Sequence, residues 1–193
     1  MTVLTLDALF ERYGTDKARS GYHTMYEMID RDRIHSALEV GIGTLDPDAH
    51  STMVGYAAEH YRPGGSLRAW RDWFEHAEIC GLDIAPDTQF SEDRITTVLA
   101  DSTDRAEVTA ALGCRMFDLI IDDGDHTPAA QIATLNNLFW RLNAGGLYVI
   151  EDITDTPLIT RLVTDWYHTT GYRTASITCR YSVYGPLMVI RRD

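Results

Sequence analysis

The sequence is poor in cysteine, in positive charge and in long apolar runs, and each shortage excludes a class of protein. Its three cysteines are too few and too widely spaced for a disulfide framework or a CxxC metal knuckle. Lysine and arginine number 17 against 29 aspartates and glutamates, a net charge of −12. We therefore expect no basic patch for nucleic acid or an anionic membrane. No apolar run approaches the length of about 18 residues that a membrane span needs.

Targeting and linker signals are also missing. The opening MTVLTLDALFERYG has no basic stretch followed by an apolar one, so we expect no signal peptide. A reducing cytoplasm fits this pattern and the cysteine usage. No internal repeat, low-complexity segment or Pro/Gly/Ser-rich linker divides the chain. Apolar residues make up 45% of the sequence, so residues 1–193 are expected to form a single globular domain.

Short apolar runs alternate with helical patterns along the chain. The spacing predicts strands over 36–43, 77–85, 94–101, 117–123, 147–152, 172–182 and 185–193. It predicts helices over 3–13, 24–34, about 50–60, 66–77, 102–113, 127–146 and 157–171. Continuous apolar strands between helices are typical of a parallel sheet covered on both faces. Because only SVYG separates the last two strands, the expected fold is α/β, a doubly wound, seven-stranded, mostly parallel sheet with an antiparallel last strand.

Acidic residues end each of the first five predicted strands. In doubly wound sheets the ligand lies in the crevice at the carboxyl ends of the strands. The acids that should meet at that edge are Glu39, Asp83, Asp101, Asp122, Asp123, Asp125, Glu151 and Asp152.

The first strand ends in the turn GIGTLD, which favours a nucleoside cofactor over a dinucleotide. The third glycine of GxGxxG is replaced by Asp46, and Asp83 follows Gly41 at more than twice the usual spacing of about 20 residues, so NAD is disfavoured. Glycines at 41 and 43 let backbone approach a ligand. Asp83 can accept both ribose hydroxyls, and Asp101 with Ser102 can meet the adenine amine. The alternative role of Asp83 and Asp101 is to cap the helices that follow.

The segment IIDDGDH, residues 120–126, predicts a metal-assisted site. Asp123 should converge with Glu151 and Asp152, and three carboxylates so close repel one another unless a cation lies between them. Oxygen ligands suit Mg²⁺ or a similar hard ion. His126 could then act as general base on a hydroxyl activated by that ion, with Asp123 as its catalytic partner; the alternative is a loop histidine that caps the next helix. Asp122 alternates to the other side of the strand, so a structural role is expected.

Together, LEVGIG, GLDI, IIDDGDH and VIEDI resemble class I S-adenosylmethionine-dependent methyltransferases. More narrowly, they are similar to the Mg²⁺-dependent sugar O-methyltransferases of macrolide biosynthesis (mycinamicin and macrocin types) and to the cephalosporin-hydroxylase-type methyltransferases. The segments RYGTDK…GYH and GGSLRAWRDWFEHAEICGLDI extend the resemblance over most of the chain.

The resemblance implies roles for particular residues. It makes His126 the catalytic base and Asp123, Glu151 and Asp152 the Mg²⁺ ligands. It places the N-terminal segment 1–34 beside the cofactor. The residues expected at S-adenosylmethionine are Tyr13, Thr15, Lys17, His23, Glu39, Gly41, Gly43, Asp83, Ile84, Asp101, Ser102 and Asp122.

The function implied is O-methylation of a small molecule, on a hydroxyl of a sugar in a secondary metabolite such as an antibiotic, by a chain that forms homo-oligomers. Asp125 departs from the small residue usual before the histidine, and the acceptor is therefore open; His50, Tyr56, Tyr181 and Tyr184 are candidates to face it. One alternative is methylation of an amine, carboxylate or carbon without catalytic metal. A cofactor-binding subunit without activity is a second alternative.

Overall fold

A single mixed sheet organises the protein in the computed structural model. The structure describes residues 4–49, 51–170, 174–181 and 185–193, with the backbone alone for 174–176 and 179–181. The eight strands lie in the order β3-β4-β2-β1-β5-β6-β8-β7. They are β1 (Ser36–Val40), β2 (Glu78–Asp83), β3 (Ser91–Glu92), β4 (Ile95–Leu99), β5 (Phe117–Asp122), β6 (Leu142–Ile150), β7 (Thr174–Tyr181) and β8 (Pro186–Arg192).

The pairing confirms the predicted fold class. Strands β4, β2, β1, β5 and β6 are mutually parallel, whereas β8 is antiparallel to both β6 and β7. The central pair β1–β5 joins the two halves of the sheet, so a crevice is expected at the carboxyl ends of these strands. The two-residue strand β3 is an addition that the sequence pattern does not predict.

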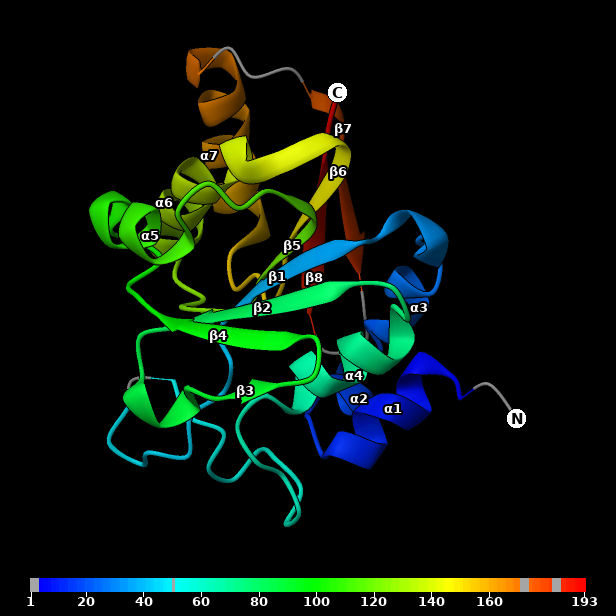
Figure 1. The fold of residues 1–193 in the computed structure, drawn as a ribbon. Coiled ribbons are helices and arrows are strands. Elements are labelled where there is room, and N and C mark those ends of the chain that lie inside the picture. Colours follow the sequence, from blue (N-terminus) through cyan, green and yellow to red (C-terminus); the bar gives the residue numbers. More distant parts are fainter. Residues whose placement is uncertain (1–3, 50, 171–173, 182–184) are drawn as a thin grey trace.

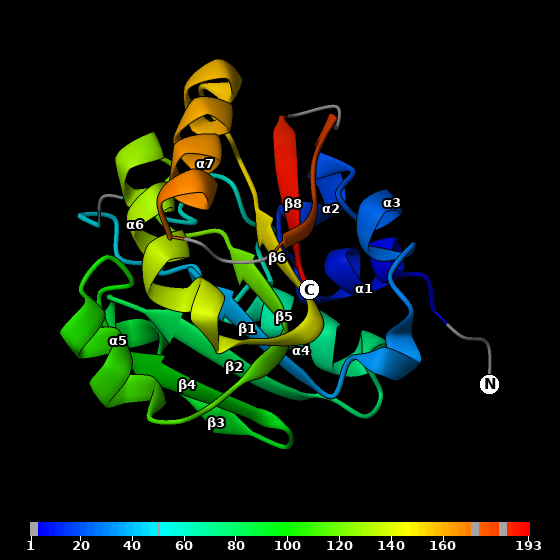
Figure 2. The same cartoon turned by 90° about the horizontal axis from the view of Figure 1, so that it is seen from above.

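Helices cover both faces of the sheet (Figures 1 and 2). One face carries α1 (Leu6–Tyr13), α2 (Lys17–Ser20), α3 (His23–Tyr26) and α4 (Gly65–Trp73), and the other carries α5 (Arg105–Leu112), α6 (Pro128–Leu138) and α7 (Thr156–Thr170). Short 3₁₀ turns complete the chain: η1 (Arg31–Arg33), η2 (Pro86–Thr88) and η3 (Phe139–Arg141). Among the described residues no helix has both the length and the apolar character that crossing a bilayer requires.

Each face of the sheet has its own apolar core. On the N-terminal face, Trp70 of α4 meets Phe10 of α1 edge to face, with ring centroids 5.0 Å apart. On the opposite face, Leu38 of β1 and Ile120 of β5 pack with Leu135 of α6. This two-sided burial is why the central strands read as uninterrupted apolar runs.

Two predicted helices are wrong. The helix predicted over 24–34 ends at Tyr26, because Asp30 is extended and its carboxylate accepts the Asp32 amide to start η1. The helix predicted near 50–60 is a loop in its described residues. Gly55 takes a left-handed φ of +87°, and the Met53 amide bonds back to the Thr44 carbonyl.

The helix predicted over 127–146 is too long. Helix α6 ends at Leu138, and strand β6 begins already at Leu142, so the Gly-Gly pair expected to stop the helix lies inside the strand. The pairing of β5 with β6 shifts register there, and Gly145 has a φ of +79°. The buried Arg141 guanidinium donates to the Gly113 carbonyl, which fixes the turn into β6.

Truncating a central strand should destabilise the fold strongly. Leu38 has no exposed surface, so we expect Leu38→Ala to cost about 2–5 kcal/mol of unfolding free energy through lost burial and a cavity. Leu99→Ala, on a residue 52% exposed, is the matched control and should change it by about 0.5 kcal/mol or less. Urea titration of both variants measures the difference, and equal losses would contradict this packing.

Candidate active site

A cavity of about 680 Å³ opens at the carboxyl ends of the strands. Most of the acids and glycines predicted at this edge line it. The predicted site residues in its lining are Thr15, Lys17, Gly41, Gly43, Asp83, Ile84, Asp101, Ser102, Asp123, His126 and Asp152. The five remaining predicted residues, Tyr13, His23, Glu39, Asp122 and Glu151, do not line it.

The turn after β1 depends on a glycine that touches β5. Gly41 has a φ of +86°, and a Cβ placed on it would lie 2.0 Å from the carbonyl oxygen of Asp123. No other residue fits, because both the conformation and the space exclude a side chain. The β1 turn and the Asp123 loop are thereby held against each other at the cavity floor.

Asp83 and Asp101 are both engaged with backbone. Asp83 accepts the Ile42 amide at 2.6 Å and the Ala85 amide at 2.8 Å, and burial raises its pKa. Asp101 accepts the Thr103 amide at 2.8 Å, and Ser102 contacts the Thr134 hydroxyl at 2.9 Å. Asp101 does not cap α5, because the N-cap of that helix is Asp104, and both Asp83 and Asp101 face the cavity. Ile84 projects into the same region with 66% of its surface exposed.

The segment IIDDGDH delivers its side chains to different places. Asp123 and His126 face the cavity, and Nε2 of His126 lies 3.4 Å from Oδ1 of Asp123. Asp122 is buried on the opposite side, accepts the Tyr148 hydroxyl at 3.2 Å, and has its pKa raised to about 7 by burial. Its predicted structural role is thus what the geometry favours. Asp125 accepts the amide of Thr127, the residue that caps α6.

Asp123, His126 and Asp152 form a group suited to a cation. Their ligand atoms all lie within 4.8 Å of one another, and Oδ2 of Asp152 is 3.8 Å from Nε2 of His126. That imidazole nitrogen is buried without a hydrogen bond to another residue. The two carboxylates suit a hard divalent ion, with the imidazole beside it, so these residues fit the predicted metal.

Lys17 lines the cavity as predicted, but its ion pairs with three carboxylates are not predicted from the sequence. It is only 3% exposed, and its ammonium lies 2.6 Å from Asp123, in contact with Glu151, and 3.3 Å from Glu39. Burial alone would lower the pKa of Lys17, but the charges of Asp123 and Glu151 raise it well above the ordinary value. Lys17 therefore remains a cation among the carboxylates, in addition to its place in the cavity wall.

Two tyrosines of the N-terminal segment, which sequence reasoning missed, also bind this cluster. The Tyr22 hydroxyl donates to Asp152 at 2.5 Å, and the Tyr26 hydroxyl donates to Glu151. Burial raises the pKa of Glu151 to about 8. Both carboxylate oxygens of Glu151 are thus already bonded, one to Tyr26 and one to Lys17. The only sequence signal for these tyrosines is their place in the segment GYHTMY, between predicted site residues.

The other residues expected at the cofactor lie elsewhere. Tyr13 donates to Asp72 at 2.6 Å, and His23 lies 3.4 Å from Asp7. Glu39 is buried beneath the turn, where it accepts from Ser66 at 2.7 Å and from Trp70 at 3.2 Å. Of the acceptor candidates, Tyr56 lines the cavity. His50, Tyr184 and the side chain of Tyr181 lie outside the described residues.

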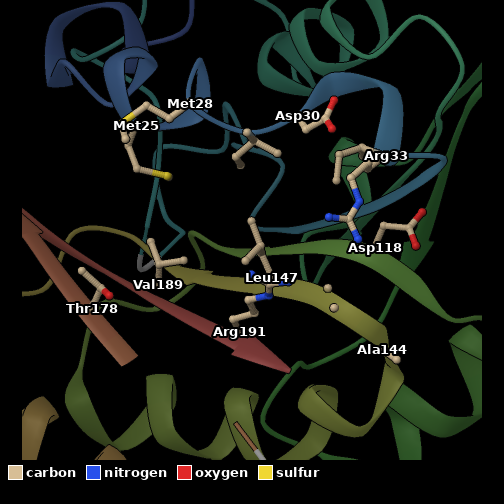
Figure 3. Close-up of a pocket in the computed structure, with 14 residues that line it drawn as sticks. Met25, Met28, Asp30, Arg33, Asp118, Ala144, Leu147, Thr178, Val189 and Arg191 are labelled. Atoms are coloured by element: carbon tan, nitrogen blue, oxygen red, sulfur yellow. The ribbon is translucent and has the colours of Figure 1, made fainter. Parts of the chain in front are cut away.

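A second cavity, of about 340 Å³, lies at the opposite edge of the sheet. It opens between the α3–η1 segment and strands β6 and β8, with Met25 and Met28 at one end and Arg33 and Asp118 at the other (Figure 3). Asp118 there is engaged by the His35 and Ser36 amides. None of the predicted site residues lines this cavity, so the site at the carboxyl ends is the candidate active site.

The comparisons with known proteins agree with this geometry. No family model matches the chain. The 8-demethyl-8-alpha-L-rhamnosyl tetracenomycin-C 2'-O-methyltransferase of Streptomyces olivaceus is 36% identical over 157 residues, which are 77% of this chain and 37% of that protein. The demethylmacrocin O-methyltransferase of Streptomyces fradiae is 40% identical over 60% of this chain and 27% of its own length. The chain thus spans well under half of the length of these curated relatives.

Solved structures share the fold. The MycE methyltransferase of the mycinamycin pathway, crystallised with Mg and SAH, superposes with a TM-score of 0.74 at 26% identity, over 99% of this chain and 54% of that one. The described fold is therefore the Rossmann-like fold of S-adenosylmethionine-dependent methyltransferases. The resemblance to the macrolide sugar O-methyltransferases is confirmed by the relatives that the chain matches.

Two glycine substitutions can separate the effect of the close contact at Gly41 from the effect of its left-handed φ. We expect Gly41→Ala to destabilise the chain by more than the about 1–3 kcal/mol of a strained φ, because the new methyl meets the Asp123 carbonyl. Gly55→Ala is the control, since Gly55 has a φ of +87° and open space around its Cβ. Thermal and urea unfolding compare the two variants, and equal losses would argue against the close approach.

The protonation of His126 should depend on Asp123. The Asp123 contact raises the pKa of His126 to about 9 against the desolvation that would lower it. The imidazolium therefore stabilises the metal-free fold fully below a pH of about 6.5, and this contribution is lost as the pH rises through about 9. We expect Asp123→Asn to return the pKa toward 6.5, as followed by NMR titration of the histidine ring. An unchanged pKa in that variant would refute the assigned cause.

Proposed function

We propose that this chain is an S-adenosylmethionine-dependent, divalent-metal-assisted O-methyltransferase that acts on a sugar hydroxyl of a small secondary metabolite, in antibiotic biosynthesis. The observation that carries the proposal is the meeting of Asp123, His126 and Asp152 beside the glycine-lined turn of β1. It puts a base and cation ligands next to a cavity wide enough for a nucleoside. The relatives' names, which specify O-methylation, support the same reaction.

The cofactor would lie across the β1 turn and the ends of β2 and β4. Gly41 and Gly43 leave the backbone open to its amino-acid tail, and Asp83 lies where ribose hydroxyls can reach its free lone pairs. The exposed side chain of Ile84 offers an apolar surface to the adenine ring of the cofactor. Tyr13 and His23 contact residues away from the cavity, so they are weaker candidates for cofactor binding than Thr15 and Lys17, which line it.

Asp123 and Asp152 would hold the cation on the cavity side. Glu151, the third predicted ligand, is buried and bonded to Lys17 and Tyr26, and would join them only if it exchanged one of these partners for the cation. When bound, a divalent ion supplies polarisation that lowers the pKa of an acceptor hydroxyl. With a cation bound, Asp123 and Asp152 would no longer hold the proton on His126, and the imidazole would be available as the base.

In the proposed reaction, S-adenosylmethionine would supply the methyl group to the acceptor oxygen and leave as the neutral thioether. Nε2 of His126 would take the proton of the acceptor hydroxyl. Lys17, anchored by three carboxylates, keeps Asp123 oriented during this step. His126 later releases its proton to water.

We further propose that residues 1–193 act as one domain in the cytoplasm and that the chain forms homo-oligomers. The single sheet with a core on each face supports the domain proposal. The second proposal rests on what the resemblance to the macrolide sugar O-methyltransferases implies, and size-exclusion chromatography with light scattering would test it.

Removing the catalytic base should slow turnover strongly and leave cofactor affinity unchanged. We expect His126→Ala to lower the rate about 10²–10⁴-fold and to leave the Kd for S-adenosylhomocysteine unchanged, because His126 takes the proton. His76→Ala, an exposed histidine after α4, is the control. Isotope transfer from labelled cofactor to glycosylated polyketide acceptors measures the rate, and calorimetry measures the Kd.

Chelation provides the complementary test of the metal. Activity should disappear in excess EDTA and return with added Mg²⁺. Full turnover in EDTA would contradict the metal's role and favour an amine, carboxylate or carbon acceptor. Failure to bind S-adenosylhomocysteine would overturn the methyltransferase proposal itself.

A further inference from the structure

Tyr22 makes two hydrogen bonds to one residue 130 positions further along the chain. It follows the left-handed Gly21 that ends α2, and it is 2% exposed. Its hydroxyl donates to Oδ1 of Asp152 at 2.5 Å and accepts the backbone amide of Asp152 at 3.2 Å. A single phenol therefore fixes both the side chain and the main chain of Asp152.

Asp152 is held in an unusual backbone conformation. Its φ is +47°, one of two positive values among the described residues other than glycine. Such a conformation costs of order 1–3 kcal/mol and persists only where the surroundings hold it. The Tyr22 hydroxyl supplies this hold at the amide, directly beside the strained φ.

The two oxygens of the Asp152 carboxylate have different neighbours. Oδ1 is taken by Tyr22, whereas Oδ2 lies 3.8 Å from Nε2 of His126, within the cluster that includes Asp123. Only one oxygen is therefore turned toward the predicted cation. Tyr22 itself does not line the cavity.

We propose that Tyr22 is a positioning residue of the metal site, which clamps Asp152 in its left-handed conformation so that Oδ2 faces the cation. This inference rests on the proposed function for the presence of the metal. Partners that orient ligating carboxylates set metal affinity, and their removal costs about 10–100-fold. Burial and Asp152 raise the pKa of the Tyr22 phenol well above its ordinary value, so the hydroxyl keeps its proton.

The clamp also links the N-terminal segment to the end of β6. The short helices α2 and α3 flank Tyr22, and their packing brings the phenol to Asp152. Tyr26, one turn further on, bonds to Glu151 instead. The two tyrosines thus act on neighbouring carboxylates, and each can be tested separately.

Mn²⁺ binding by Tyr22→Phe tests the clamp without turnover. Free Mn²⁺ is counted by electron paramagnetic resonance, and S-adenosylhomocysteine affinity is measured by calorimetry in parallel. We expect Mn²⁺ affinity to fall about 10–100-fold and S-adenosylhomocysteine affinity to stay unchanged. Ser36→Ala is the control, because it removes a hydroxyl–carboxylate hydrogen bond, to Asp118, at the other edge of the sheet. Its Mn²⁺ affinity should equal that of the wild type.

A double-mutant cycle shows whether Tyr22 acts through Asp152. In the Asp152→Ala background, Tyr22→Phe should cost no further Mn²⁺ affinity; an additive loss would overturn the inference.

Should Tyr22→Phe fail to fold, hydrogen exchange of the wild type decides, since the Asp152 amide should be protected and rapid exchange would refute the clamp. Unchanged Mn²⁺ binding by Tyr22→Phe would overturn this inference alone. A wild type that binds no Mn²⁺ would overturn the metal in the proposed function and the inference with it.

Discussion

The arrangement of the site depends on the pairing of one buried ammonium with two buried carboxylates and a third that faces the cavity. Lys17 comes from the short helix α2, and Glu39, Asp123 and Glu151 come from the ends of three adjacent strands. Buried charges are tolerated only when they are paired and hydrogen-bonded. The N-terminal segment therefore has to close over the sheet edge, because without Lys17 the three carboxylates would repel one another in a dry environment.

Because these charges must be paired, many residues around the cavity form hydrogen bonds with the carboxylates of the cluster. Ser66 and Trp70 of α4 satisfy Glu39, while Tyr26 satisfies Glu151. Gly41 lets the β1 turn touch the Asp123 carbonyl, so the acids of two strands share one floor. Asp123, His126 and Asp152 remain in the cavity wall, where the proposed reaction needs them.

A cation would change the charge of this edge without rebuilding it. In the described structure, Asp123 and its neighbours hold the pKa of His126 at about 9, which suits an acid better than a base at neutral pH. Ligand oxygens occupied by a divalent ion no longer favour the imidazolium. Metal binding and the availability of a general base are thus two aspects of one electrostatic balance.

The sequence by itself determined the fold class and the edge where function lies. The apolar runs of β1, β2 and β5 and the acids that follow them are local patterns, and parallel strands bring their carboxyl ends together. Only the tertiary structure decided which of the other acids face the cavity: Asp123 does, whereas Glu39 and Glu151 do not. It also decided that Lys17, Tyr22 and Tyr26 bind the cluster. Those contacts join positions more than a hundred residues apart, and no periodicity along the chain encodes them.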